Sequence, residues 1–132
     1  MRPLVTVQTI DEVITQAEKT GGAIAATPAT DTIKKSDPEH LIENTLRRED
    51  KWLAQTPQAF RYEILKEAFE KASEDGYLGT DEAELVERLG KEVKLVKSSK
   101  YNIKITTPED LELGEIFLAS SLHRNEKGIN YV

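Results

Sequence analysis

The order of helix-like and strand-like segments is the feature of this sequence that most limits its fold. The apolar spacing predicts an amphipathic helix from about Thr9 to Lys19, which Gly21 and Gly22 end. The small and apolar residues 22–27 follow as a buried strand. Further helices are predicted at 62–73, 80–89 and from 107 onward, with short strands at 93–96 and 102–106. This alternation is typical of α/β proteins.

The ends of two helices can also be predicted from side-chain chemistry. Thr9 or Asp11 is expected to cap the first helix, because short oxygen-bearing side chains accept from the free N–H groups of the first turn. Thr107 followed by Pro108 indicates a sharp start of the last helix. That helix is expected to give way to a loose tail at about 125–132.

Residues at about 30–50 are expected to leave the body of the domain as a two-stranded arm. Two extended stretches, 31–35 and 42–48, flank a polar turn at Ser36, Asp37 and Pro38. They carry few large apolar residues, and an isolated two-stranded ribbon is marginally stable in water. The arm is therefore expected to lie on another surface, most simply that of a second subunit.

Composition excludes several classes of protein. The chain has 132 residues and no cysteine, so disulfide scaffolds, thiolate nucleophiles and cysteine metal sites are excluded. Its formal net charge of −6 disfavours general nucleic-acid binding, which depends on neutralising phosphates. No apolar run approaches the roughly 20 residues that span a membrane, and no signal peptide is recognised. A cytoplasmic protein, either one domain or a piece of a larger one, is expected.

Several basic and hydroxyl-bearing residues stand in patterns that suit a phosphate ligand. Arginine is well shaped for bidentate phosphate binding, and a lysine near a strand end offers a point charge. Each pattern also has a simpler interpretation: a solvated lysine, surface charge at the paired Arg47 and Arg48, a turn at Thr56-Pro57, or a helix cap within 79–83. The candidates are Thr32, Lys34, Arg48, Thr56, Thr80 and Lys104. No catalytic triad or paired carboxylates are found.

Taken together, these patterns resemble a known family. The strings that carry the resemblance are Arg2-Pro3, TDTIK at 30–34, AQTPQAF at 54–60, TDEA at 80–83 and NIKITTPEDL at 102–111, with Arg48 and Trp52 between them. From Arg2 to about Leu118 the chain is similar to the carboxy-terminal portion of the 2-C-methyl-D-erythritol 4-phosphate cytidylyltransferases. The resemblance implies the carboxy-terminal half of a doubly wound, Rossmann-like nucleotidyltransferase fold, with a protruding β-arm that swaps across a homodimer.

The resemblance also implies an activity and the residues that serve it. The family transfers CMP from CTP to methylerythritol phosphate in the non-mevalonate isoprenoid pathway, releases pyrophosphate and uses magnesium. Two matched residues imply a catalytic role, positioning the substrate phosphate for attack: Lys104, and Arg48 acting on the partner subunit's site. The matched substrate-binding residues are Arg2, Thr32, Lys34, Thr56 and Thr80.

The sequence departs from the family pattern on the nucleotide side. The family's glycine-rich loop, which cradles the triphosphate with an arginine and a lysine, has no counterpart here, and neither does its metal-binding aspartate. We therefore expect a truncated form that has no metal ligand in this chain and is inactive alone. Two alternatives stay open: a ribitol 5-phosphate cytidylyltransferase and a non-catalytic dimerisation fragment.

Overall fold

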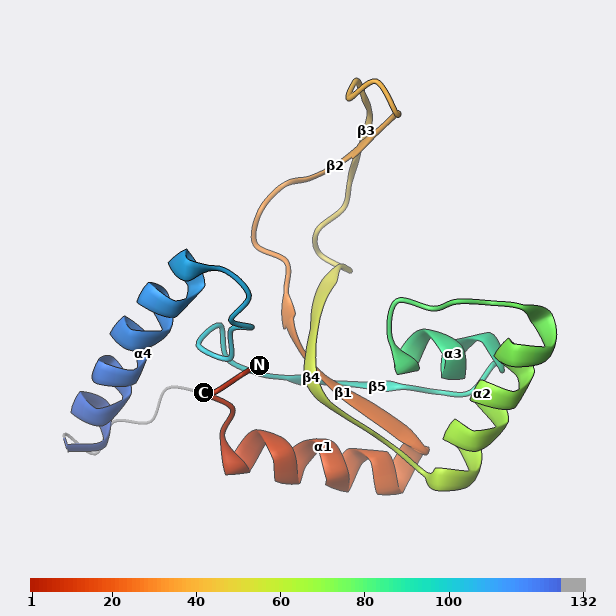
Figure 1. Cartoon of the computed structure of the whole chain (residues 1–132), viewed down its shortest axis with the longest axis horizontal. Helices are drawn as coiled ribbons and strands as arrows, with labels where there is room; N and C mark the ends of the chain where they lie inside the picture. Colours follow the sequence, from red (N-terminus) through yellow and green to blue (C-terminus); the bar gives the residue numbers. More distant parts are fainter. Residues whose placement is uncertain (127–132) are drawn as a thin grey trace.

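The computed structural model describes residues 1–126 as an α/β body from which a narrow arm projects (Figure 1). A three-stranded sheet forms the centre of the body, in the order β4-β1-β5. The middle strand, β1 (Gly22–Pro28), pairs antiparallel with β4 (Trp52–Phe60) and parallel with β5 (Lys94–Lys97). The predicted buried strand at 22–27 is confirmed, and it is the most deeply buried strand of the sheet.

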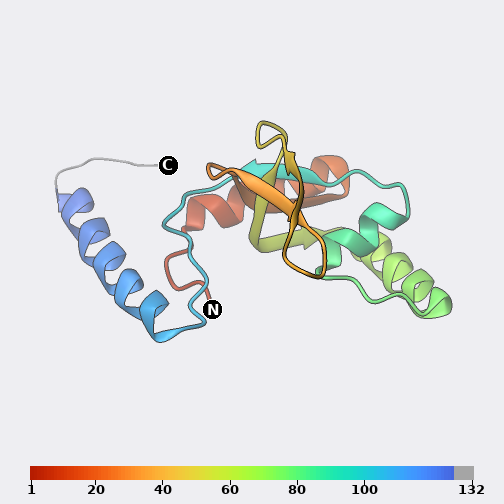
Figure 2. The same ribbon diagram turned by 90° about the horizontal axis from the view of Figure 1, so that it is seen from above.

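Helices cover both faces of this sheet. On one face, α1 (Val7–Thr20) packs Val13 and Ala17 against Ala23, Ala25 and Val96. The opposite face is covered by α2 (Tyr62–Asp75) and α3 (Glu82–Arg88). Their shared core contains Ala68, Ala72, Leu85 and Val86. Figure 2 shows the helices on the two sides of the strands. Successive residues of a strand point to opposite faces of the sheet. Because β1 consists mainly of small and apolar residues, both of its faces are apolar.

The first helix begins earlier than the sequence pattern predicts. Its cap is Thr6, whose hydroxyl accepts from the N–H of Thr9 at 3.1 Å. The prediction of Thr9 or Asp11 as the cap is therefore wrong: the apolar spacing marks the buried stripe, whereas the helix extends one turn beyond it. Gly21 ends the helix with a φ of 100°, a left-handed conformation that glycine adopts without strain.

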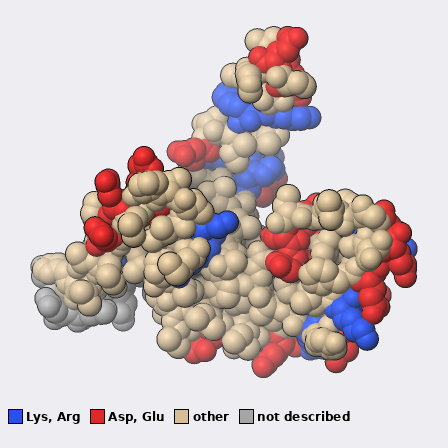
Figure 3. Space-filling view, viewed as in Figure 1, with Lys and Arg blue, Asp and Glu red and all other residues tan. Residues whose placement is uncertain are grey.

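The predicted arm is present. It consists of β2 (Ile33–Ser36) and β3 (Ile42–Leu46), which pair antiparallel as a separate sheet. Figure 1 shows that it stands clear of the body. At its tip the Asp37 carboxylate accepts from the N–H groups of Glu39 and Leu41, which holds the turn. Basic atoms band the arm, while acidic atoms gather over α2 and α4 (Figure 3).

The predicted strand at 102–106 is wrong. This segment is not part of either sheet, and the N–H of Ile105 instead donates to the carbonyl of Met1 at 2.8 Å. The chain start and this segment therefore lie side by side, as Figure 2 shows. The predicted alternation is nevertheless confirmed: Ile103 and Ile105 are half-buried, whereas Lys104 between them is exposed. Both isoleucines reach Gly114 of α4 (Pro108–Glu126).

The last helix confirms the predicted start, because Thr107 accepts from the N–H of Asp110. Helix α4 continues to Glu126, so residues 125 and 126 of the predicted loose tail are helical, and the rest of that tail lies outside the described residues. Within residues 1–126, no helix combines the length and the apolar character that crossing a membrane requires.

Candidate functional site

A cavity of about 550 Å³ opens where four separate parts of the chain meet. The chain start, β4, the loop before α3 and the segment at 102–106 form its wall. Four of the residues predicted from sequence line it together: Arg2, Thr56, Thr80 and Lys104. They lie up to 102 positions apart in the sequence, yet the fold brings them to one hollow.

Arg2 is held at the cavity by the backbone beside it. One guanidinium nitrogen, Nη1, donates to the carbonyl of Asn102 at 2.6 Å. Partial burial lowers the pKa of Arg2 from its ordinary value, but an arginine stays protonated in proteins. The remaining N–H groups of this half-buried side chain are available to an anion. Arg2 therefore supplies a fixed, directional positive charge.

Lys104 supplies the second positive charge of the cavity wall. The half-buried Ile103 and Ile105 on either side anchor the backbone, and the side chain of Lys104 is exposed. Within residues 1–126, no carboxylate forms an ion pair with it. Its charge is accordingly available to a ligand.

The two threonines are oriented differently. Thr56 lies in β4 and its side chain is exposed to the cavity. Thr80 donates from both its N–H and its hydroxyl to one oxygen of Glu84, at 2.6 and 2.9 Å. Because its hydroxyl hydrogen is used in this way, Thr80 can offer a ligand only an acceptor.

The Glu84 carboxylate is itself part of a small network. The Tyr77 hydroxyl donates to its other oxygen. This hydrogen bond, followed by those from Thr80, lowers the pKa of Glu84. The same contact raises the pKa of Tyr77. Glu84 therefore stays ionised and fixes the loop that carries Thr80.

Sequence analysis missed four polar residues that also line the cavity: Gln55, Gln58, Asp81 and Glu82. The Asp81 carboxylate caps α3 by accepting from the N–H of Glu84 at 2.9 Å, and it accepts from Gln58 Nε2 at 3.1 Å. Strand periodicity could not have identified Gln55 and Gln58, because the pairing of β4 with β1 shifts register in this stretch and the consecutive residues Gln55 and Thr56 both line the cavity.

The three predicted residues on the arm are not part of this cavity. Arg48 donates through Nη1 to the carbonyl of Thr30 at 2.7 Å, at the base of the arm. Lys34 donates through Nζ to the hydroxyl of Thr45 at 2.7 Å, across the two arm strands. Thr32 is exposed just before β2. Within one chain, the structure thus separates Arg48 from Lys104.

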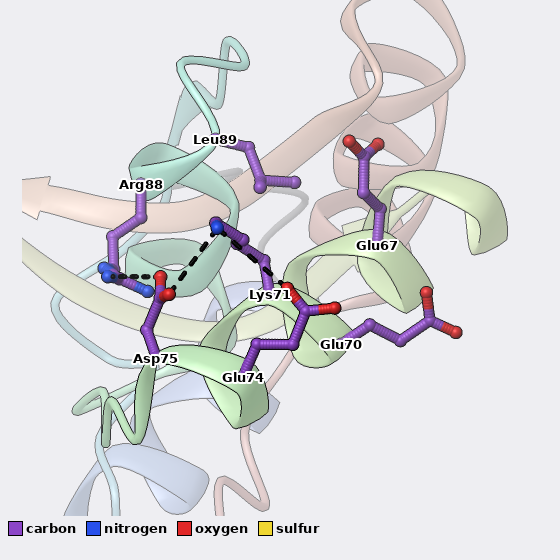
Figure 4. Close-up of a pocket in the computed structure, with 7 residues that line it drawn as sticks. All are labelled: Glu67, Glu70, Lys71, Glu74, Asp75, Arg88 and Leu89. Carbon is purple, nitrogen blue, oxygen red and sulfur yellow. Dashed lines mark hydrogen bonds and ion pairs between the residues drawn. The ribbon is translucent and has the colours of Figure 1, made fainter.

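A second hollow, of about 440 Å³, lies between α2 and α3 (Figure 4). Acidic residues of α2 line much of it, and most of its charged side chains, though not Glu67, take part in ion pairs. Asp75 contacts both Lys71, at 3.5 Å, and Arg88, at 3.1 Å. None of the predicted site residues lies here. In the part of the chain that the structure describes, no group of three or more metal-binding side chains is found.

Comparison with known proteins shows what this arrangement is similar to. The family profile of 2-C-methyl-D-erythritol 4-phosphate cytidylyltransferase matches residues 1–120. The enzyme of that name from Syntrophus aciditrophicus is 53% identical over 118 residues, covering 89% of this chain and 50% of that protein. The one from Geobacillus kaustophilus is 48% identical over 121 residues, covering 92% and 53%. The chain thus spans about half the length of these relatives.

Solved structures show the same fold. The 2-C-methyl-D-erythritol 4-phosphate cytidylyltransferase from Thermus thermophilus aligns with a TM-score of 0.79 at 35% identity, covering 89% of this chain and 58% of that one. The one from Francisella tularensis aligns with a TM-score of 0.81 at 35% identity, covering 88% and 55%. The expected fold class, part of a Rossmann-like nucleotidyltransferase, is confirmed.

Proposed function

Because the chain belongs to the 2-C-methyl-D-erythritol 4-phosphate cytidylyltransferase family, we propose that it provides the polyol phosphate side of that enzyme's site. The reaction transfers CMP from CTP to methylerythritol phosphate and releases pyrophosphate. The observation that carries the proposal is the convergence of Arg2, Thr56, Thr80 and Lys104 on one cavity. Each of these residues matches the family pattern, and they come from distant parts of the sequence.

This reaction requires positive charge in the wall of the cavity. An oxygen of the methylerythritol phosphate attacks the α-phosphorus of CTP, a new P–O bond forms, and the bond to the pyrophosphate leaving group breaks. Both reactants are anions, so fixed cations lower the cost of bringing them together and align the attack. Arg2 binds and orients the attacking phosphate, and Lys104 neutralises its charge. Thr56 donates its hydroxyl hydrogen, while Thr80 accepts from a polyol hydroxyl.

We further propose a homodimer in which the arm of each subunit reaches the other subunit's cavity. The arm stands clear of its own body, and Leu41 and Ile42 on it are 62% and 64% exposed. In this arrangement Arg48 serves the partner's cavity as a positioning residue, with Thr32 and Lys34 binding substrate beside it. Light scattering of the purified chain tests the proposal. A dimer that becomes a monomer in Leu41→Asp/Ile42→Asp supports it, whereas a wild-type monomer refutes it.

Magnesium, which the family resemblance implies, does not fit the residues of this cavity. The two carboxylates of the cavity wall, Asp81 and Glu82, are adjacent in the sequence. The Asp81 carboxylate already accepts hydrogen bonds from the N–H of Glu84 and from Gln58 Nε2. Within residues 1–126, no third acidic or histidine side chain joins them. The residues of this cavity therefore do not form a magnesium site.

We propose that the chain binds methylerythritol phosphate but does not transfer CMP by itself, and one set of experiments tests both statements. We expect the purified chain to bind methylerythritol phosphate, measured by NMR titration, with shifts at Thr56, Thr80 and Lys104. We expect no pyrophosphate release when CTP and magnesium are added, because the glycine-rich loop that the family resemblance implies for the triphosphate has no counterpart in this sequence. Ribitol 5-phosphate serves as the comparison ligand. Absence of binding, or equal binding of ribitol 5-phosphate, would contradict the proposed substrate, and robust pyrophosphate release would contradict the division of roles.

A further inference from the structure

Asn102 joins three of the four parts that form the cavity wall, namely the chain start, β4 and its own segment at 102–106, although it does not line the cavity itself. Its side chain is buried, with 3% of the residue exposed. The amide nitrogen Nδ2 donates twice: to Gln55 Oε1 at 3.0 Å and to the carbonyl of Thr56 at 2.9 Å. Both hydrogens of the amide are therefore used to bind β4.

The backbone of Asn102 makes the connection on the other side. Its carbonyl is the acceptor that holds Arg2 Nη1 at 2.6 Å. Its N–H donates to the carbonyl of Ser99 at 3.1 Å, which also accepts from Gln55 Nε2 at 3.3 Å. One residue thus links Arg2 to the strand that carries Thr56.

Lys104 depends on the same anchor. It follows Asn102 by two positions, in a segment that belongs to neither sheet. The next residue, Ile105, is bound through its N–H to the carbonyl of Met1, directly before Arg2. Fixing residue 102 to β4 therefore fixes both the chain start and the lysine relative to Thr56.

We propose that Asn102 is the positioning residue of the polyol phosphate site, acting through Arg2, Thr56 and Lys104 without touching the ligand. This rests on the proposed function for the identity of the ligand, but not for the positioning itself. Asparagine is specifically suited to the role, because only a short amide places two donors on one atom facing two acceptors. Alanine would leave the Gln55 and Thr56 acceptors buried without partners, and an ionised aspartate would oppose them with further acceptors.

The test uses the full chain with Asn102→Ala, Asn102→Asp and the control Asn44→Ala, which alters an exposed arm asparagine. In the ligand-free protein, ¹⁵N relaxation of the Arg2 side-chain Nε reports its order. We expect an ordered Arg2 in wild type and control, and a mobile Arg2 in Asn102→Ala, with the amide spectra of α1 and α2 unchanged. Methylerythritol phosphate binding should weaken about ten-fold in Asn102→Ala, equivalent to about 1.4 kcal/mol.

Failure of the proposed function and failure of the positioning role give different results. If wild type does not bind methylerythritol phosphate, the proposed function fails, but the order of Arg2 still decides the positioning role. If Asn102→Ala does not fold, Asn102→Asp decides it: a protonated carboxyl regains one donor, so Arg2 should be mobile at neutral pH and regain order in mild acid. An Arg2 that stays ordered in Asn102→Ala, or that ignores pH in Asn102→Asp, overturns the inference.

Discussion

Replacing Lys104 by alanine should weaken polyol phosphate binding without altering the fold. The side chain is exposed and lines the cavity, so no core contact is lost. Arg2 remains as the other cation of the wall. The substitution therefore isolates one positive charge and asks how much of the binding free energy depends on it.

The size of the cavity sets the magnitude of the expected loss of binding free energy. A volume of about 550 Å³ corresponds to a sphere of radius about 5 Å, the distance over which Lys104 would act on a central phosphate dianion. Coulomb's law with the dielectric constant of water gives about 1.7 kcal/mol, or about a 15-fold loss of affinity at low salt. Screening at about 0.15 M salt reduces this to about 0.9 kcal/mol, or about 5-fold. At about 1 M salt the effect should fall below about 2-fold.

The assay is a titration of methylerythritol phosphate at these three salt concentrations, with thermal unfolding as a check on stability. Lys100→Ala is the matched control, because this exposed lysine is four positions away and donates to Thr30 Oγ1 outside the cavity. We expect the control to bind as wild type does. Equal weakening in both variants would show a diffuse effect of net charge. An unchanged affinity in Lys104→Ala, or a loss that does not depend on salt, would refute the electrostatic reasoning.

Three other outcomes are expected. Gly22→Ala should lower the free energy of unfolding by about 1–3 kcal/mol in urea titrations, because overpacking strains a core and the new Cβ would lie 2.6 Å from Phe60 Cδ1. The stability that the ionised Glu84 carboxylate contributes should be complete above its ordinary pKa of 4.5 and be lost as the pH falls through its lowered pKa in the folded protein. This loss should be seen as faster amide exchange in α3, and Glu84→Gln should remove the pH dependence. Inorganic phosphate should bind at least about ten-fold more weakly than methylerythritol phosphate in competition titrations, a gap of about 1.4 kcal/mol, and equal affinities would contradict a role for the polyol contacts.

The sequence predicted most of the elements because their periodicity reflects burial. The strand at 22–27 consists of small and apolar residues that the structure buries. The helix at 62–73 packs Ile64, Leu65 and Ala68 into the core, whereas Phe69 on the same apolar stripe is 49% exposed. The strand predicted at 102–106 failed for a related reason. Alternation of Ile103, Lys104 and Ile105 reports which side is buried, but a strand also needs a neighbouring ladder, and here the isoleucines pack on α4 instead.

The residues that line the cavity are easier to predict from family motifs than from local physical chemistry. Nothing local to Arg2 or Thr56 indicates that they line one cavity, because their proximity depends on the path of the whole chain. The sequence does not distinguish Asn102, since a buried asparagine resembles a surface one until its partners are known. Residues that act through others are therefore the hardest to predict from sequence.

Two carboxylates also stand in the wall of the cavity, and the ligand proposed for it accounts for their presence. Asp81 and Glu82 would repel a bare anion, although hydrogen bonds from the N–H of Glu84 and from Gln58 Nε2 stabilise the negative charge of Asp81. Thr80 offers an acceptor on the same side, since its hydroxyl hydrogen is bound to Glu84. Acceptors suit the hydroxyl groups of a polyol, whereas Arg2 and Lys104 suit its phosphate. A wall with cations and acceptors together accordingly favours a ligand that carries phosphate and hydroxyl groups on one short chain, and disfavours a simple anion.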